Sequence, residues 1–124
     1  GSFLHVSGLT YEIHTYVPSS AQSDENGMFA GVTGEYRVKN VTIGGEPLDV
    51  EKTYKLASHN YMLKNSGDGY SMFKGAKLLI DETLIDNQVL ITYITTTLGG
   101  VVGEEYANPY GQGRIIGVPE APAQ

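Results

Sequence analysis

Nine residues, from Leu9 to Val17, alternate between two sets of side chains, and this alternation constrains the fold more than any other feature of the sequence. Successive side chains of a β-strand point to opposite faces, so the pattern predicts a half-buried strand. With 124 residues, 40% of them hydrophobic, the chain is long enough to bury a core in one domain. The residues expected on one face are Leu9, Tyr11, Ile13, Thr15 and Val17.

A second strand is predicted over residues 36–43. Its apolar positions shift parity between Val38 and Val41, which indicates a β-bulge near Lys39 and Asn40. Residues 18–34 are rich in Ser, Asp, Asn and Gly and predict a long surface loop anchored by Phe29. Further strands are expected at 53–58 and 114–118, and a short strand or an extended segment at 3–6 and at 77–80. Turns are expected at 44–47 and 49–52, and a helical turn at 59–64.

One principal helix is predicted at about residues 86–98. Val89, Leu90, Tyr93, Ile94 and Leu98 recur on one face, and Gly99-Gly100 provides a stop. Asp86 is expected to cap its N-terminus. Many of its residues are β-branched, so the helix is expected to be stable only when packed. The fold class is α+β, with a mostly antiparallel sheet and this one principal C-terminal helix.

Composition excludes several kinds of partner and site. The net charge is −6 and the eight basic residues are scattered, so a nucleic-acid polymer is not an expected partner. There is no cysteine for a disulfide or a Cys-ligated metal. His5, His14 and His59 are far apart and lack acidic partners in a metal-ligand pattern, so no metal or other cofactor is expected on this chain. We expect a small-molecule partner.

The segment Ser66-Gly67-Asp68-Gly69-Tyr70 predicts a tight turn that presents an aromatic ring. Gly67 and Gly69 can adopt positive φ, and Asp68 can hydrogen-bond neighbouring amides. Tyr70 is then either one wall of a binding site or a packing residue. Phe3 has two similar alternatives, as a binding residue or as a core residue of an edge strand. For His5, the alternative to a binding role is a histidine that faces the solvent.

Five segments follow one another along the chain: Gly1 to Leu9, Tyr36-Arg37-Val38 with Gly45-Glu46-Pro47-Leu48-Asp49, Thr53 to Ser58, Gly67 to Tyr70, and Gly113-Arg114-Ile115. In this order they resemble the C-terminal domain of the bacterial 5'-nucleotidase, UDP-sugar hydrolase and 2',3'-cyclic-nucleotide phosphodiesterase family. The resemblance implies that Phe3 and Tyr70 clamp the base of a nucleotide or nucleoside, that His5 lies at the base edge, and that Gly67, Asp68 and Gly69 shape the clamp.

The resemblance also implies what lies outside the sequence. Hydrolysis in the family belongs to a separate N-terminal metallophosphoesterase domain with two divalent metal ions, so no residue of this chain is expected to be catalytic and the chain alone is expected to be inactive. Bacterial members are exported, which implies a secreted, periplasmic or cell-surface location. Residues 1–118 are expected to form part of the domain, truncated on its N-terminal side, and 119–124 a flexible tail. Such a fragment is expected to dimerise or exchange segments.

Two departures from the family pattern keep a second function open. Ser66 stands where relatives have glycine, and residues 71–76 lack the carboxylate that relatives often use to hold the ribose. The alternative is therefore a non-catalytic surface or adhesion module that keeps the fold without binding substrate.

Overall fold

A computed structural model describes residues 3–108 and 111–122 of the chain. It divides into two compact units, and we describe each by itself. The strand unit comprises the chain up to Leu56 and from Gly111 onward, and the loop unit starts at Ala57 and ends before Gly111. The two units together confirm the α+β class. That residues 1–118 form one partial domain stays a prediction, and of the expected tail, positions 123–124 lie outside the described residues, as do positions 1–2.

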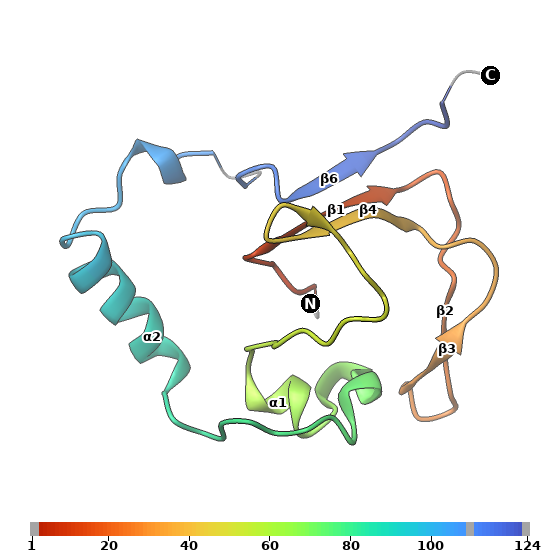
Figure 1. The fold of residues 1–124 in the computed structure, drawn as a ribbon, viewed down its shortest axis with the longest axis horizontal. Coiled ribbons are helices and arrows are strands. Elements are labelled where there is room, and N and C mark those ends of the chain that lie inside the picture. The colour runs from red at the N-terminus through yellow and green to blue at the C-terminus, as the bar shows by residue number, and fades with distance from the viewer. Residues whose placement is uncertain (1–2, 109–110, 123–124) are drawn as a thin grey trace. The chain divides into compact units, whose positions relative to one another are not determined.

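The strand unit contains a four-stranded sheet in the order β5-β4-β1-β6 (Figure 1). Strand β1 (Leu9–His14) pairs antiparallel with β4 (Val38–Ile43), and β4 pairs antiparallel with β5 (Glu46–Pro47). Strand β6 (Ile115–Val118) pairs with β1 in parallel. The sheet is thus mostly antiparallel, as predicted, and β1 is its central strand because it has partners on both sides.

The predicted bulge is present in β4. Thr10 lies opposite Thr42 and Glu12 lies opposite Lys39, so β4 contains one residue more than β1 over this interval. Asn40 takes up the extra residue with a left-handed φ of 51°. The bulge explains the shift of parity in the sequence, because it brings Val38 and Ile43 to the same face, opposite Ile13 and Leu9.

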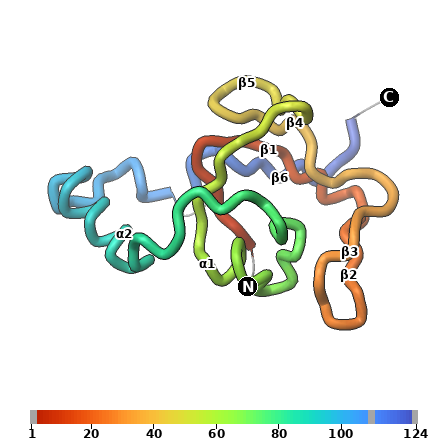
Figure 2. The backbone as a smooth tube through the Cα atoms, turned by 60° about the horizontal axis from the view of Figure 1, so that its bottom comes forward, coloured from red at the N-terminus to blue at the C-terminus, as the bar shows by residue number. Residues whose placement is uncertain are grey.

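The segment predicted as a surface loop, residues 18–34, contains a β-hairpin. Strands β2 (Ala21–Ser23) and β3 (Phe29–Val32) pair antiparallel, and in Figure 2 the hairpin extends away from the four-stranded sheet. The Asp24 carboxylate stabilises its turn by accepting hydrogen bonds from the amides of Asn26 and Met28, both at 2.9 Å. Composition predicted a surface segment but not the pairing of its two strands.

The strand predicted at 53–58 is wrong, because these residues have no strand in the described structure. Residues 3–6 and 77–80, each predicted as a short strand or an extended segment, have no strand there either. In the segment 53–58, the Tyr54 hydroxyl accepts a hydrogen bond from the amide of Asp49, at 3.0 Å. These segments have β-propensity, but a strand forms only where another strand supplies partners for its backbone N–H and C=O groups.

The loop unit consists of short helices joined by irregular segments (Figure 1). The helical turn predicted at 59–64 is confirmed as α1, and the principal helix as α2 with its continuation η3, a π-helical turn. The helices are α1 (Asn60–Leu63), η1 (Gly67–Gly69), η2 (Ser71–Phe73), α2 (Asp86–Thr92), η3 (Tyr93–Thr97) and η4 (Glu104–Tyr106).

The ends of α2 and η3 confirm one prediction and correct another. Gly99 and Gly100 have left-handed φ values of 67° and 85°, and the Gly100 amide donates to the carbonyl of Ile94 at 2.8 Å, as expected of a helix stop. The N-cap, however, is Ile85, and Asp86 is the first helical residue. Its charge still favours the helix N-terminus, through the helix dipole.

Few side chains are fully buried. Val17 and Met62 are the buried apolar residues among those described, one in each unit, and Leu90 on α2 is 60% exposed. Val17 is held by the Arg37 side chain, whose Nε donates to its carbonyl at 2.8 Å. Within the described part of the chain, no helix is both long and apolar enough to cross a membrane.

Candidate functional site

The segment Ser66–Tyr70 forms the tight turn that the sequence predicts. The amide of Gly69 donates to the carbonyl of Ser66 at 3.2 Å, and the amide of Tyr70 donates to that of Gly67 at 3.1 Å. Left-handed φ values occur at Ser66 (55°), Asp68 (51°) and Gly69 (85°). The turn therefore holds the backbone of Tyr70 in a defined orientation. We call residues 66–70 the presenting loop.

Two details of the presenting loop differ from expectation. Gly67 does not have positive φ, and Ser66 does. Gly67 is required for space instead, because a Cβ atom built on it would lie 2.4 Å from Cε1 of the Tyr61 ring. Ser66 occupies a left-handed conformation that costs a non-glycine residue about 1–2 kcal/mol. The serine that replaces the family's glycine thus lies at a position where glycine is favoured.

Tyr61 connects helix α1 to the presenting loop, and sequence analysis missed it. Its backbone amide donates to Nδ1 of His59, the N-cap of α1, at 3.1 Å. Its hydroxyl donates to Oδ1 of Asp68 at 3.1 Å. Asp68 was expected to bond neighbouring amides and instead accepts from a side chain seven residues away. Only the aromatic character of Tyr61, close before a glycine turn, could have indicated this contact.

Phe73 is a second residue that sequence analysis missed. Its ring is parallel to that of Tyr70, with an interplanar angle of 3° and centroids 6.3 Å apart. The two aromatic residues flank a single 3₁₀ turn at positions i and i+3, where side chains lie above one another. That spacing is visible in the sequence, but the sequence did not predict the 3₁₀ turn that brings the two rings together. Phe73 thus lies parallel to, and beside, the half-buried Tyr70 ring.

Phe3 and His5 belong to the strand unit, whereas Tyr70, Gly67, Asp68 and Gly69 belong to the loop unit. The structure brings Phe3 and His5 together, with their ring centroids 5.4 Å apart in an edge-to-face arrangement. Phe3 is 55% exposed. A clamp formed by Phe3 and Tyr70 stays a prediction.

The strand unit contains two polar features that are alternative candidate sites. The first is a hydrogen-bonded chain on the polar face of β1. The buried His14 bonds Glu12 through Nε2 (2.7 Å) and Tyr16 through Nδ1 (2.8 Å), and the Asn40 amide donates to the same Glu12 oxygen at 2.8 Å. Hydrogen bonds from His14 and Asn40 hold the pKa of Glu12 below its ordinary value. Both ring nitrogens of His14 have partners, so we interpret this chain as structural.

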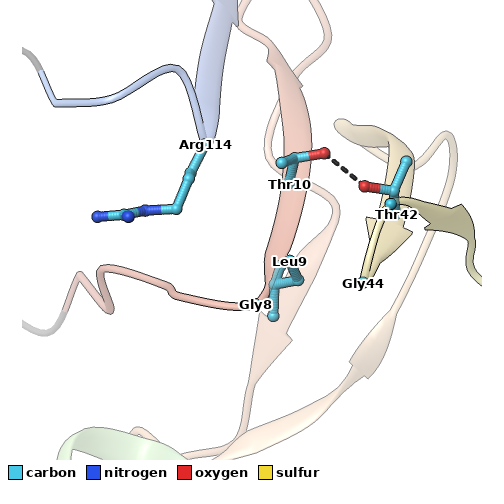
Figure 3. Close-up of a pocket in the computed structure, with 7 residues that line it drawn as sticks. Gly8, Leu9, Thr10, Thr42, Gly44 and Arg114 are labelled. Carbon is cyan, nitrogen blue, oxygen red and sulfur yellow. Dashed lines mark hydrogen bonds between the residues drawn. The ribbon is translucent and has the colours of Figure 1, made fainter.

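The second is a shallow cavity of about 200 Å³ at the start of β1, shown in Figure 3. The hydroxyls of Thr10 and Thr42 bond each other at 2.6 Å, and the Arg114 side chain extends away from them. The guanidinium of Arg114 donates to Oε1 of Gln112 at 2.9 Å. The lining offers little polar chemistry to a ligand. It comprises Gly8, Leu9, Thr10, Thr42, Gly44, Gly45 and Arg114.

Across residues 3–108 and 111–122, no group of three or more His, Asp or Glu side chains is placed to hold an ion. The described residues thus offer aromatic surfaces and a shaped loop, which suit the binding of a flat ring.

Comparisons with known proteins identify the family of the chain. The family model described as 5'-nucleotidase, C-terminal domain, matches residues 1–75, a range that includes Phe3, Tyr61 and the whole presenting loop. Protein UshA of Yersinia enterocolitica is 42% identical over 57 residues, which cover 46% of this chain and 10% of that protein. No solved structure matches the chain. Because the family model matches more than half of its residues, the chain belongs to the family of 5'-nucleotidase C-terminal domains.

Proposed function

We propose that this chain binds the base of a nucleotide or nucleoside, with Tyr70 as a stacking surface and Phe3 as the second aromatic contact. The observation that carries the proposal is the presenting loop, in which residues with left-handed φ angles precede Tyr70 and fix its backbone. The loop lies inside the region that matches the family. Strained backbone persists only where the surrounding structure holds it, and such strain concentrates at functional sites.

The chemistry of the proposed contacts suits a base of any kind. Every nucleobase has two π-faces, and stacking on an aromatic side chain contributes about 1–3 kcal/mol per base. The Phe73 ring, parallel to that of Tyr70, helps to define the orientation of the stacking surface. His5, next to Phe3, can donate or accept a hydrogen bond at the base edge. Two such contacts account for about the 4 kcal/mol of a millimolar complex, so phosphate contacts must supply the rest.

Hydrolysis in this proposal takes place elsewhere. The chain spans about a tenth of the length of the relative it matches, and the proposal assigns ester hydrolysis to a separate N-terminal metallophosphoesterase domain that holds two divalent metal ions. The residues of this chain would bind and orient the nucleoside. The same proposal makes the whole protein an exported 5'-nucleotidase-type hydrolase.

Calorimetric titration of the full-length protein with adenosine and with uridine tests the proposal. We expect Tyr70→Ala and Phe3→Ala each to weaken binding of both nucleosides about 5- to 150-fold, since each removes one stacking contact. Tyr36→Ala is the matched control, because Tyr36 is a 64% exposed tyrosine outside the proposed site. Unchanged affinity in Tyr70→Ala would contradict the proposal.

The second candidate function is a surface or adhesion module that does not bind nucleosides. Residues 71–76, directly after Tyr70, contain no carboxylate to hold a ribose. Under this alternative the unsubstituted full-length protein gives no heat signal with either nucleoside. A measurable affinity that falls in the Tyr70→Ala variant excludes it.

A further inference from the structure

We propose that Tyr61 is a positioning residue for Tyr70. It fills the space beside Gly67, bonds Asp68, and thereby fixes the conformation of the presenting loop. The inference rests on the proposed function of Tyr70 and extends it to a residue that contacts the loop from helix α1.

The presenting loop needs such a support because its backbone is strained. Ser66 and Asp68 both have left-handed φ, and a non-glycine residue in that region costs about 1–2 kcal/mol. The two backbone hydrogen bonds inside the loop, from Gly69 and Tyr70, are 3.2 and 3.1 Å long. A contact from outside the loop must therefore help to favour this conformation over relaxed ones.

Tyr61 supplies two contacts of different kinds. Its ring lies so close to the buried Gly67 that three ring atoms would be 2.4–2.5 Å from a Cβ atom at that position. Its hydroxyl donates to the Asp68 carboxylate at 3.1 Å. The two contacted residues are consecutive and come directly before Gly69 and Tyr70, so a shift of Tyr61 changes the path of the backbone that carries the Tyr70 ring.

The position of Tyr61 is set independently of the loop, by helix α1. The cap residue His59 accepts from the Tyr61 amide at 3.1 Å, and the His59 and Tyr61 rings meet edge to face with centroids 6.4 Å apart. At the other end of α1, Lys64 bonds Asp81 at 2.6 Å and Glu82 at 3.1 Å. Tyr61 therefore connects a helix held at both ends to the loop that presents Tyr70.

Substitutions at both sides of the contact test the inference in the full-length protein. We expect Gly67→Ala, which drives a methyl group into the Tyr61 ring, and Tyr61→Ala, which removes the ring, each to weaken adenosine binding about tenfold. The double variant should bind no more weakly than Tyr61→Ala alone, because without the ring the added methyl group meets no clash. Effects that multiply in the double variant overturn the inference.

Tyr61→Phe keeps the ring, and with it the fold, and removes only the hydrogen bond to Asp68. We expect about a threefold loss of adenosine affinity, in line with the usual worth of one hydrogen bond. Tyr54→Phe is the matched control, since it also removes a tyrosine hydroxyl that bonds the chain locally, but in the strand unit. It should leave adenosine binding unchanged.

Ribose 5-phosphate, which lacks a base, separates positioning from general damage. If Tyr61 acts through Tyr70, its variants lose affinity for adenosine and keep that for ribose 5-phosphate, whereas an equal loss for both ligands overturns the inference. If Tyr70→Ala itself leaves adenosine binding unchanged, the proposed function fails and the inference with it. If Tyr70→Ala weakens binding but the Tyr61 and Gly67 variants do not, only the inference fails.

Discussion

The strand unit and the loop unit are each stabilised by a different kind of internal contact. In the strand unit, β1 pairs with β4 about 30 residues away and with β6 about 100 residues away, so its geometry depends on distant segments. In the loop unit, the presenting loop is held by Tyr61, within nine residues of Tyr70. Substitutions in the strand unit should therefore change stability, and those in the loop unit should chiefly change the geometry of a few residues.

The largest effect is expected at His14. Replacing it by alanine removes a buried ring together with its hydrogen bonds to the half-buried Glu12 and Tyr16, and should lower the free energy of unfolding by about 2–3 kcal/mol. Urea unfolding followed by circular dichroism measures this, since the chain has no tryptophan for fluorescence. Lys52→Ala, which removes an exposed ion pair with Asp49 at 3.8 Å, is the control and should change stability by less than about 0.5 kcal/mol. If His14→Ala and Lys52→Ala lower stability equally, the hydrogen-bonded chain around His14 does not stabilise the strand unit more than an exposed ion pair does.

Gly45, in the turn between β4 and β5, should give the next largest effect. Its φ is 88°, so Gly45→Ala forces an alanine into the left-handed region and should lower the free energy of unfolding by about 1 kcal/mol. Urea unfolding again provides the measurement. Gly117→Ala is a suitable control, because that glycine has no positive φ and a Cβ there meets no atom within 4 Å. If the Gly117 variant loses as much, the conformation of the turn is not the cause.

Ser66→Gly should have the opposite sign. It relieves a left-handed φ of 55° in the presenting loop and should raise the free energy of unfolding of the loop unit by about 0.5–1 kcal/mol. Native-state hydrogen exchange of amides 66–70 reports this locally. Slower exchange is expected, and faster exchange would show that the serine side chain, and not its φ, matters most. Adenosine affinity should stay the same or rise, because the loop conformation is kept.

Acid should weaken the strand unit through Glu12. Its pKa lies below the ordinary 4.5 because His14 and Asn40 donate hydrogen bonds to the carboxylate. Its contribution to stability is therefore complete above about pH 4.5 and is lost as the pH falls through the lower pKa of the folded state. Glu12→Gln should flatten the dependence of the unfolding midpoint on pH in this range. A variant with the same slope as the parent would rule out Glu12 as its source.

Alkali should weaken the loop unit, by a smaller amount, through Lys64. Hydrogen bonds to Asp81 and then to Glu82 raise the pKa of its amine above 10.5. The stabilisation is complete below pH 10.5 and is lost as the pH rises through the higher pKa of the folded state. Because the three side chains are exposed, 0.5 M salt should screen much of the effect. Hydrogen exchange or proteolysis at α1 measures it, and Lys64→Met should abolish the dependence on pH.

Sequence reasoning succeeded where the cause lay within a few residues. The shift of parity between Val38 and Val41 predicted the bulge at Asn40, and Gly99-Gly100 predicted the end of the principal helix. It failed where the cause was a distant partner. Residues 53–58 have β-propensity but no strand to pair with, while the predicted loop contains a hairpin that Asp24 stabilises.

For the candidate site, too, the sequence predicted the features with a local cause and missed those that depend on contacts in space. By itself the sequence determined the α+β class, the strand that begins at Leu9, the tight turn of the presenting loop and the family, because alternation, glycine turns and ordered motifs are local signals. Only the tertiary structure decided that Gly67 is needed for space, that Ser66 is the strained residue, and that Tyr61 and Phe73 contact the loop. The physical reason is that φ angles and ring contacts depend on which side chains lie next to one another in space. Residue identity and spacing are compatible with several such arrangements.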